Sequence, residues 1–380
     1  MVPIYLDYNA TTPIDPAVRA AILPFLGEQF GNPSSAHAYG KAAHAAVEQA
    51  RLQVAELLGA QPDEIVFTGG GSEASNHAIK GVAFARWRPG GEPPHVVTTA
   101  VEHPATLRPC DFLRRLGCEV TVLPVDRSGR MDPEAVRRAI TPRTVLVTVM
   151  HANNEVGTLQ PVRDIAAIAH DRGVTVHTDA AQSVGKIAVD VEELGVDLLS
   201  VAGHKLYAPK GVGVLYVRRG TRLDSLIHGA GHEGGRRAGT ENVPYVVGLG
   251  AACELARKSL PAATERLRTL RDRLWDRLRS GLCDAVTLNG HPTERLPNTL
   301  NINFAGRVGA ELLAAIPDVA ASTGSACHEG QVTLSPVLAA MGVPPEVGRG
   351  AVRLSVGRFT TEDEIDRAAG LLVAAARQGG

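Results

Sequence analysis

Two residues, Lys205 and Asp179, carry the clearest chemical signal in the sequence. Lys205 follows the apolar run 197–201 and is one of six lysines, at positions 41, 80, 186, 205, 210 and 258. Asp179 follows the short β-branched run 173–177. A lysine that forms a Schiff base and an acid that pairs with a pyridinium nitrogen are the arrangement of enzymes that use pyridoxal 5′-phosphate (PLP). Taken singly, Asp179 would be interpreted as a helix cap and Lys205 as a surface charge.

A glycine turn at residues 68–74, Thr-Gly-Gly-Gly-Ser-Glu-Ala, is the third signal. Such a turn between a strand and a helix presents backbone N–H groups to a phosphate. It also fits the G-x-G-x-x-A pattern of nicotinamide dehydrogenases, in which an acid follows about 20 residues later. That acid would be Glu92, which lies in a Pro- and Gly-rich segment and not at a strand end. Phosphate turn, acid and lysine in this chain order therefore favour PLP. Lys210, between Pro209 and Gly211, is a rival Schiff-base lysine in a predicted exposed turn.

Cys327 lies among small residues in the segment 321–330, directly after a predicted strand. Small neighbours leave the sulfur accessible and allow the loop to move. His328 favours the thiolate and Glu329 opposes it, so the sequence leaves the pKa of this thiol open. Cys327 could instead ligate a metal or cluster shared with a partner, since one cysteine cannot complete such a site. The remaining cysteines are expected to be core or surface residues and lie at positions 110, 118, 253 and 283.

His103 and Arg353 are two further candidates. His103 follows a predicted strand and could stack on a planar cofactor ring, or it could be a hydrogen-bonded loop histidine. Arg353 interrupts an apolar strand. Its guanidinium could hold a substrate carboxylate with two hydrogen bonds, or it could form a structural ion pair.

The elements that must position these residues alternate between strands and helices. Short apolar runs at 65–68, 95–99, 118–125, 144–150, 173–177, 197–201 and 211–217 are separated by helical patterns. This alternation predicts βαβ units and a mostly parallel sheet, with a ligand beyond the carboxyl ends of the strands. A long helix at about 242–279 is expected to bridge to a smaller α+β unit with strands at 299–304, 319–322 and 351–356 and a last helix from Thr361.

Composition excludes several classes of protein. The 39 basic and 40 acidic residues give a net charge of -1, which argues against direct binding of nucleic acid or of a membrane surface. No apolar stretch approaches the roughly 20 residues that cross a bilayer. The N-terminus resembles no export signal, so we expect a cytoplasmic protein. Five cysteines, an odd number without a C-x-x-C pair, argue against a disulfide framework and a structural zinc site.

Across nearly its whole length the chain resembles the cysteine desulfurases, PLP enzymes of the class V aminotransferase group within fold type I. The resemblance implies a large domain, 15–257, with a seven-stranded, mostly parallel sheet between helices, and a small domain, 1–14 and 258–380, that carries the cysteine loop. The matching segments are 5–12, 31–35, 151–157, 179–182, 203–205 and 324–327.

The resemblance also implies roles for individual residues. Lys205 would hold PLP, Asp179 would pair with the ring nitrogen, and His103 would stack on the ring and move protons. Arg353 would bind the substrate carboxylate, and Cys327 would attack the substrate sulfur. The other implied contacts are Asn154 and Gln182 to the ring and its phenolic oxygen, Gly71, Ser72 and His204 to the phosphate with Thr240 of a second subunit, and Asn32 and Asn154 to the substrate.

The implied reaction converts L-cysteine to L-alanine and leaves a persulfide on Cys327 for an acceptor protein. Acceptors in the family serve iron–sulfur assembly, tRNA thiolation or bacterial DNA phosphorothioation, and the chain length and the position of Cys327 also resemble the last group. A homodimer is implied. Selenocysteine lyases share the fold and resemble the segment 335–338, and a PLP aminotransferase is a further alternative. Ala202 replaces a serine that contacts the phosphate in many relatives, which puts one hydrogen bond in doubt.

Overall fold

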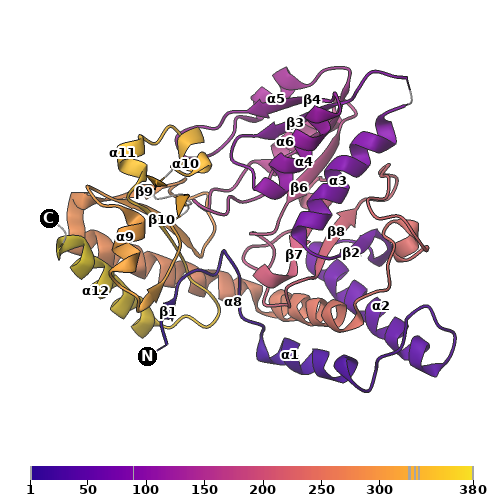
Figure 1. The fold of residues 1–380 in the computed structure, drawn as a ribbon, viewed down its shortest axis with the longest axis horizontal. Helices are drawn as coiled ribbons and strands as arrows, with labels where there is room; N and C mark the ends of the chain where they lie inside the picture. The colour runs from indigo at the N-terminus through magenta and orange to yellow at the C-terminus, as the bar shows by residue number, and fades with distance from the viewer. Residues whose placement is uncertain (1, 89, 324–326, 329–330, 333, 379–380) are drawn as a thin grey trace.

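The computed structural model describes residues 2–88, 90–323, 327–328, 331–332 and 334–378, and a long helix joins its two main sheets (Figure 1). The larger sheet has seven strands in the order β2-β8-β7-β6-β5-β3-β4. Its neighbours from β4 to β7 pair in parallel, whereas β8 pairs antiparallel with both β2 and β7. The predicted, mostly parallel sheet is therefore confirmed. Its strands are β2 (Ile65–Thr68), β3 (His95–Thr99), β4 (Glu119–Leu123), β5 (Thr144–Thr148), β6 (Thr175–Asp179), β7 (Leu198–Ala202) and β8 (Gly213–Val217).

Helices cover both faces of this sheet because alternate side chains of its strands point to opposite faces. On β2, Ile65 and Phe67 pack into one core with residues of α2, α6 and α8, whereas Val66 packs into a second core with residues of α3 and α4. Burial on both faces explains why the strands are nearly continuous apolar runs. These helices are α2 (Ala38–Leu58), α3 (Gly71–Arg86), α4 (Pro104–Arg115), α5 (Pro133–Ala139), α6 (Val162–His170) and α8 (Val243–Leu282).

The smaller sheet has the order β14-β10-β9 and is antiparallel throughout. Its strands are β9 (Val286–Asn289), β10 (Thr299–Phe304) and β14 (Ala351–Ser355), and its helices are α9 (Gly309–Ala314) and α12 (Glu362–Gln378). Two short pairs accompany it, the parallel pair β1 (Ile4–Tyr5) with β11 (Val319–Ala320) and the antiparallel pair β12 (Cys327–His328) with β13 (Gln331–Val332).

The remaining elements are short. They are α1 (Pro16–Ile22), η1 (Leu23–Leu26), η2 (Pro62–Glu64), α7 (Val191–Leu194), η3 (Gly203–Lys205), η4 (Glu233–Gly235), η5 (Cys283–Ala285), α10 (Pro336–Ala340) and α11 (Pro345–Gly348). No helix within the described ranges combines the length and the apolar character needed to span a bilayer.

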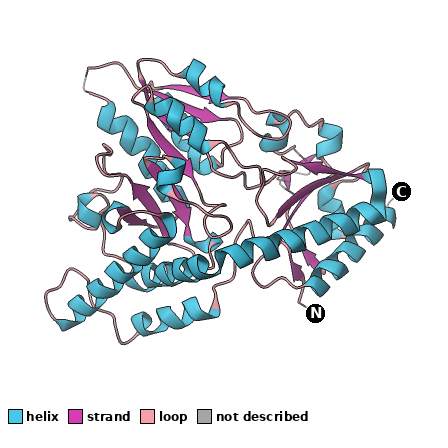
Figure 2. Cartoon of the chain, turned by 180° about the vertical axis from the view of Figure 1, so that it is seen from behind, coloured by secondary structure: helices cyan, strands magenta, loops and turns pink. Residues whose placement is uncertain are grey.

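Helix α8 runs from the large sheet to the small one (Figure 2). Its side chains up to Ala256 pack into the core of the large sheet, and those from Leu267 onward pack into the core of the small sheet together with Ile4 and Leu6. This change of core supports the division predicted from the sequence. We propose a large domain of residues 15–257 and a small domain of residues 1–14 and 258–380.

The boundaries of several elements differ from those predicted. Strand β6 extends to Asp179, two residues beyond the predicted run, because Asp179 still pairs with Ser200 of β7. Strand β9 lies outside the strands predicted from the sequence. Only two of its four residues are buried, so its apolar signal is weak.

Candidate active site

A cavity of about 660 Å³ is lined by residues at the carboxyl ends of large-sheet strands and by Arg353 of the small domain. Ligands of open α/β sheets bind at this edge. Among the predicted site residues, the cavity brings together Gly71, Ser72, His103, Asn154, Asp179, Gln182, His204, Lys205 and Arg353. The functional cluster therefore comes from segments far apart in the sequence.

The glycine turn after β2 forms one wall of this cavity. Gly70 has a φ of 146°, which a residue with a side chain rarely adopts, and it caps the N-terminus of α3. A Cβ on Gly213, the first residue of β8, would lie 2.6 Å from the Gly70 carbonyl carbon. This position of β8 must therefore also be a glycine. Backbone N–H groups and the helix dipole together favour an anion here.

Glu73 holds this turn in place. Its carboxylate accepts a hydrogen bond from Gly69 N at 2.8 Å and forms an ion pair with Arg237 at 2.8 Å. The turn is thereby tied to the segment that precedes Thr240. Ala202 lies against the turn, since a Cβ on Gly71 would be 3.0 Å from the Cβ of Ala202. The position therefore offers an anion a methyl group and no hydroxyl.

Lys205 lies at the end of η3, directly after β7. Burial lowers the pKa of its amine below the usual range, Asp179 opposes this shift, and Arg353 adds to it. A larger fraction of the amine is therefore unprotonated and nucleophilic at neutral pH. The rival Lys210 also lines the cavity but is exposed, as expected for a turn.

The N-terminal segment fixes the backbone around Lys205. Thr12 donates both its N–H and its hydroxyl to the carbonyl of His204, each at 3.0 Å. The Thr12 hydroxyl also accepts from Tyr207 N at 2.9 Å. His204 contacts the Thr11 hydroxyl at 3.1 Å, and burial lowers the pKa of this imidazole to about 4, so it is neutral at pH 7.

Asp179 and His103 lie on the same cavity. Asp179 is 8% exposed and accepts from Ala181 N at 2.9 Å, and no salt bridge in the described ranges involves it. A cationic ligand atom would therefore find an available carboxylate there. His103 accepts from Ala105 N through Nδ1 at 3.0 Å, which places the proton of the neutral ring on Nε2. Burial lowers the pKa of His103, and Lys205 adds to this shift.

Arg353 lines the cavity and keeps one donor unpaired. It is 7% exposed, and it donates to Asp7 Oδ1 at 2.7 Å and to the Asn154 carbonyl at 3.1 Å. Its Nε is buried and has no partner among the described residues. Because an unsatisfied buried N–H is costly, this group is prepared to bind an acceptor such as a carboxylate.

The structure describes the backbone of Cys327 but not its side chain. Its backbone forms β12, which pairs with β13, but its side chain lies outside the described part of the chain, as do Gly324, Ser325 and Ala326. Of the other cysteines, Cys110, Cys118 and Cys253 are buried and Cys283 is exposed. Burial raises the pKa of all three buried thiols, that of Cys110 to about 12, which disfavours their nucleophilic thiolates.

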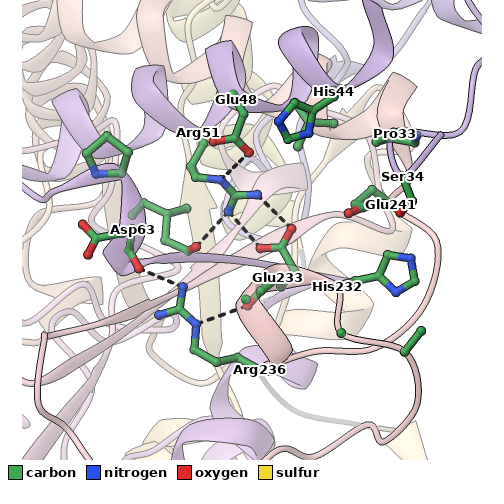
Figure 3. Close-up of a pocket in the computed structure, with 16 residues that line it drawn as sticks. Pro33, Ser34, His44, Glu48, Arg51, Asp63, His232, Glu233, Arg236 and Glu241 are labelled. Atoms are coloured by element: carbon green, nitrogen blue, oxygen red, sulfur yellow. Dashed lines mark hydrogen bonds and ion pairs between the residues drawn. The ribbon is translucent and has the colours of Figure 1, made fainter. Parts of the chain in front are cut away.

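Asn32 and Thr240 do not line this cavity in the single chain, and both are exposed. Their neighbours Ser34 and Glu241 line a second cavity of about 690 Å³ (Figure 3). There Arg51 forms two hydrogen bonds with the carboxylate of Glu233, at 2.8 and 3.0 Å. This second cavity contains no lysine, and its central charges are already paired, so it is the weaker candidate for catalysis.

Sequence reasoning assigned no role to Asp7, Asn9, Thr12, Glu73 or Lys186, which hold the site in place. Asn9 donates through Nδ2 to Thr299 Oγ1 at 2.8 Å and to the Asn154 carbonyl at 3.2 Å. The segment 5–12 has no helical or strand periodicity, so the signal for its residues was the match of this segment to the cysteine desulfurases.

Glu102 links the ends of β3 and β5 and binds the backbone of Met150, which lines the cavity. It is 4% exposed and accepts from Met150 N at 2.8 Å and from the Thr99 hydroxyl at 2.7 Å. Burial raises the pKa of this carboxyl from 4.5 to about 8, because desolvation outweighs the two hydrogen bonds.

The cavity thus offers an anion cradle, a buried amine, a free carboxylate and a free guanidinium N–H. This donor set fits PLP, which presents a phosphate, a carbonyl carbon and a ring nitrogen, together with an amino-acid carboxylate at Arg353. Among the described residues, no group of three or more His, Cys, Asp or Glu side chains is placed to hold a metal ion.

Comparison with known proteins identifies one family over most of the chain. The family model for aminotransferase class-V matches residues 4–368. A curated relative, cysteine desulfurase IscS of Dictyoglomus turgidum, is 47% identical over 365 residues, which cover 96% of this chain and 92% of the relative.

Two solved structures agree with this match. A NifS-like protein superposes with a TM-score of 0.91 at 36% identity and covers 98% of this chain and 99% of its own. A structure of SspA in complex with cysteine superposes with a TM-score of 0.82 at 37% identity and covers 94% of this chain and 99% of its own.

We predict that Glu102→Gln changes the pH dependence of stability. In the wild type the unfolded chain loses this proton near pH 4.5, whereas the folded protein keeps it until about pH 8. Wild-type stability therefore falls relative to the variant as pH rises across this interval, by about 1.4 kcal/mol per pH unit. Urea unfolding measured across the interval checks this. The exposed Glu28→Gln is the control, and parallel profiles for wild type and Glu102→Gln would contradict the prediction.

Proposed function

The chain belongs to the aminotransferase class-V family, among its cysteine desulfurases, and from this premise we propose that it uses PLP to convert L-cysteine into L-alanine. Its sulfur would be loaded on Cys327. The observation that carries the proposal is the shared cavity of Lys205, Asp179 and the glycine turn. The match to SspA in complex with cysteine supports the substrate.

In this proposal different residues of the cavity would bind different groups of PLP. The turn at Gly69–Gly71 and Ser72 would hold the phosphate, Lys205 would bond to the carbonyl carbon, and Asp179 would pair with the ring nitrogen. PLP supplies an electron sink for the pair that remains when a Cα proton leaves. Ala202 gives this phosphate one hydrogen-bond donor fewer than a serine would.

The remaining steps belong to residues of this chain. Arg353 would orient the substrate carboxylate through its free Nε, while Asp7 holds the guanidinium in place. With PLP bound, Lys205 would be the residue that accepts the Cα proton, because its lowered pKa favours the unprotonated amine. The Cys327 thiolate would then attack the substrate Sγ. The S–S bond of a persulfide would form and the Cβ–S bond would break. The electron pair of that bond would stay with the substrate carbon, Cβ would take up a proton, and alanine would leave.

We also propose that the chain acts as a homodimer and passes its sulfur to an acceptor protein. Thr240 is exposed and outside the cavity of its own chain, as expected for a residue that contacts the phosphate of a second subunit. Four exposed apolar side chains between residues 23 and 39 offer a surface for a partner protein. They belong to Leu23, Leu26, Phe30 and Tyr39.

The absorption spectrum tests the cofactor and its lysine. We expect wild type supplied with PLP to show a visible band that shifts on addition of L-cysteine, and Lys205→Ala to lack the normal band. Lys210→Ala is the matched control, because this lysine lines the same cavity but is exposed. A wild type that binds no PLP would defeat the proposed function. Loss of the band only in Lys210→Ala would show that Lys210, and not Lys205, forms the Schiff base.

Cys327→Ala separates cofactor binding from sulfur transfer. We expect this variant to keep the visible band and to release neither alanine nor sulfide, because the sulfur has no thiolate to receive it. Cys283→Ala, at an exposed cysteine, should retain full activity. Full turnover by Cys327→Ala would refute the role of this residue. Wild-type kcat/KM for L-selenocysteine far above that for L-cysteine would instead identify a selenocysteine lyase.

Arg353→Gln should weaken substrate binding. Loss of charge-assisted hydrogen bonds to a carboxylate predicts a KM for L-cysteine about 10- to 100-fold higher. Steady-state kinetics measure this, with the visible band as evidence that PLP is still bound. An unchanged KM would show that the carboxylate binds elsewhere.

A further inference from the structure

Lys186 is a buried lysine that no step of the proposed reaction uses. It lies 7% exposed in the loop after β6. Its Nζ donates to Gln182 Oε1 at 2.8 Å and to Asn9 Oδ1 at 3.1 Å. Both acceptors are neutral amides, and no salt bridge in the described part of the chain involves this lysine. A buried cation without an acidic partner is costly, so the amine requires another explanation.

The charges around Lys186 favour its neutral form. Burial lowers the pKa of its amine well below the usual value, and Lys205 and Arg353 add to this shift. Behind it lies a cavity of about 110 Å³, whose other titratable lining residues are Tyr8, Lys205, Tyr207, Arg266 and Arg358. A neutral amine has two N–H groups, and the two amide oxygens satisfy both.

The contact with Lys186 fixes which end of the Gln182 amide is free. Oε1 accepts from Lys186, while Nε2 donates one hydrogen to the Asn9 carbonyl at 3.0 Å. The second Nε2 hydrogen has no acceptor among the described residues, and Gln182 lines the main cavity with Lys205. Gln182 therefore offers a donor to a ligand and not an acceptor.

Asn9 is held by the same amine. Its Oδ1 also accepts from Asn298 Nδ2 at 3.0 Å, and its Nδ2 donates to Thr299 Oγ1 at 2.8 Å. Lys186 thus connects the Gln182 amide of the large domain to residues that precede and begin β10 of the small domain. A buried network in which both amide oxygens already accept from Lys186 has one orientation for each amide.

We propose that Lys186 is a positioning residue that directs the Gln182 side-chain N–H to the phenolic oxygen of bound PLP. The inference rests on the proposed function, because it needs PLP at Lys205. Lys186 itself does not line the main cavity. It acts by occupying the acceptor ends of two amides, so that only a donor end remains for the cofactor.

The test compares Lys186→Met with Lys186→Gln, two uncharged side chains of which only the second can donate to Gln182 Oε1. For apoprotein titrated with PLP, we expect the Kd to rise about five- to tenfold in Lys186→Met and to stay within about twofold of wild type in Lys186→Gln. The midpoint of the pH titration of the visible band should move to higher pH in Lys186→Met alone, because a phenolic oxygen without its donor attracts the neighbouring Schiff-base proton more strongly.

A double variant shows whether Lys186 acts through Gln182. In a Gln182→Met background, Lys186→Met should change the Kd for PLP by less than about twofold. The exposed Lys258→Met is the matched control, with no change expected. If Lys186→Met only lowers the thermal midpoint and leaves Kd and titration unchanged, or if its effect is as large without Gln182, the proposal is wrong. A wild type that binds no PLP would instead defeat the proposed function itself.

Discussion

Burial of the Lys205 amine beside Asp179 is the constraint on which the rest of the structure depends. An amine surrounded by bulk water stays protonated, whereas burial and the nearby Arg353 lower the pKa of this one. The position is available because β7 lies inside the large sheet, where β6 and β5 run parallel to it and end at the same edge. Thr12 then fixes the backbone on either side of the lysine.

The N-terminal segment contacts residues of both domains and so fixes how they lie around the cavity. Asp7 holds Arg353 of the small domain, Asn9 contacts Asn154 and Thr299, and Thr12 binds the turn at Lys205. A fourth apolar cluster, which includes Val101, Met150, Leu338 and Met341, packs the large domain against the segment after the cysteine loop. Amine and guanidinium are therefore held in one cavity although they belong to different sheets.

Much of the fold followed from periodicity and turn residues. Strands buried on both faces are continuous apolar runs, so all seven strands of the large sheet were predicted, and the long helix was predicted to within a few residues. Weakly buried strands such as β9 were not predicted, because few of their residues are apolar and buried. Residues that react with a cofactor carry a chemical signal in their type, as Lys205 and Asp179 do. Asn9 and Thr12 instead act through contacts over 145 to 290 positions, and Lys186 reaches Asn9 over 177 positions.

The sequence by itself determined the fold class, the family and the candidate chemistry, because residue type and local spacing encode strands, helices, a phosphate turn and a Schiff-base lysine. Only the tertiary structure decided the environment of each group. It showed that Lys205 is half-buried with a desolvated amine and Lys210 is exposed, that Arg353 Nε has no partner among the described residues, and that Lys186 donates to Gln182. The physical reason is that desolvation and hydrogen-bond satisfaction depend on neighbours brought together by folding, which local sequence does not specify.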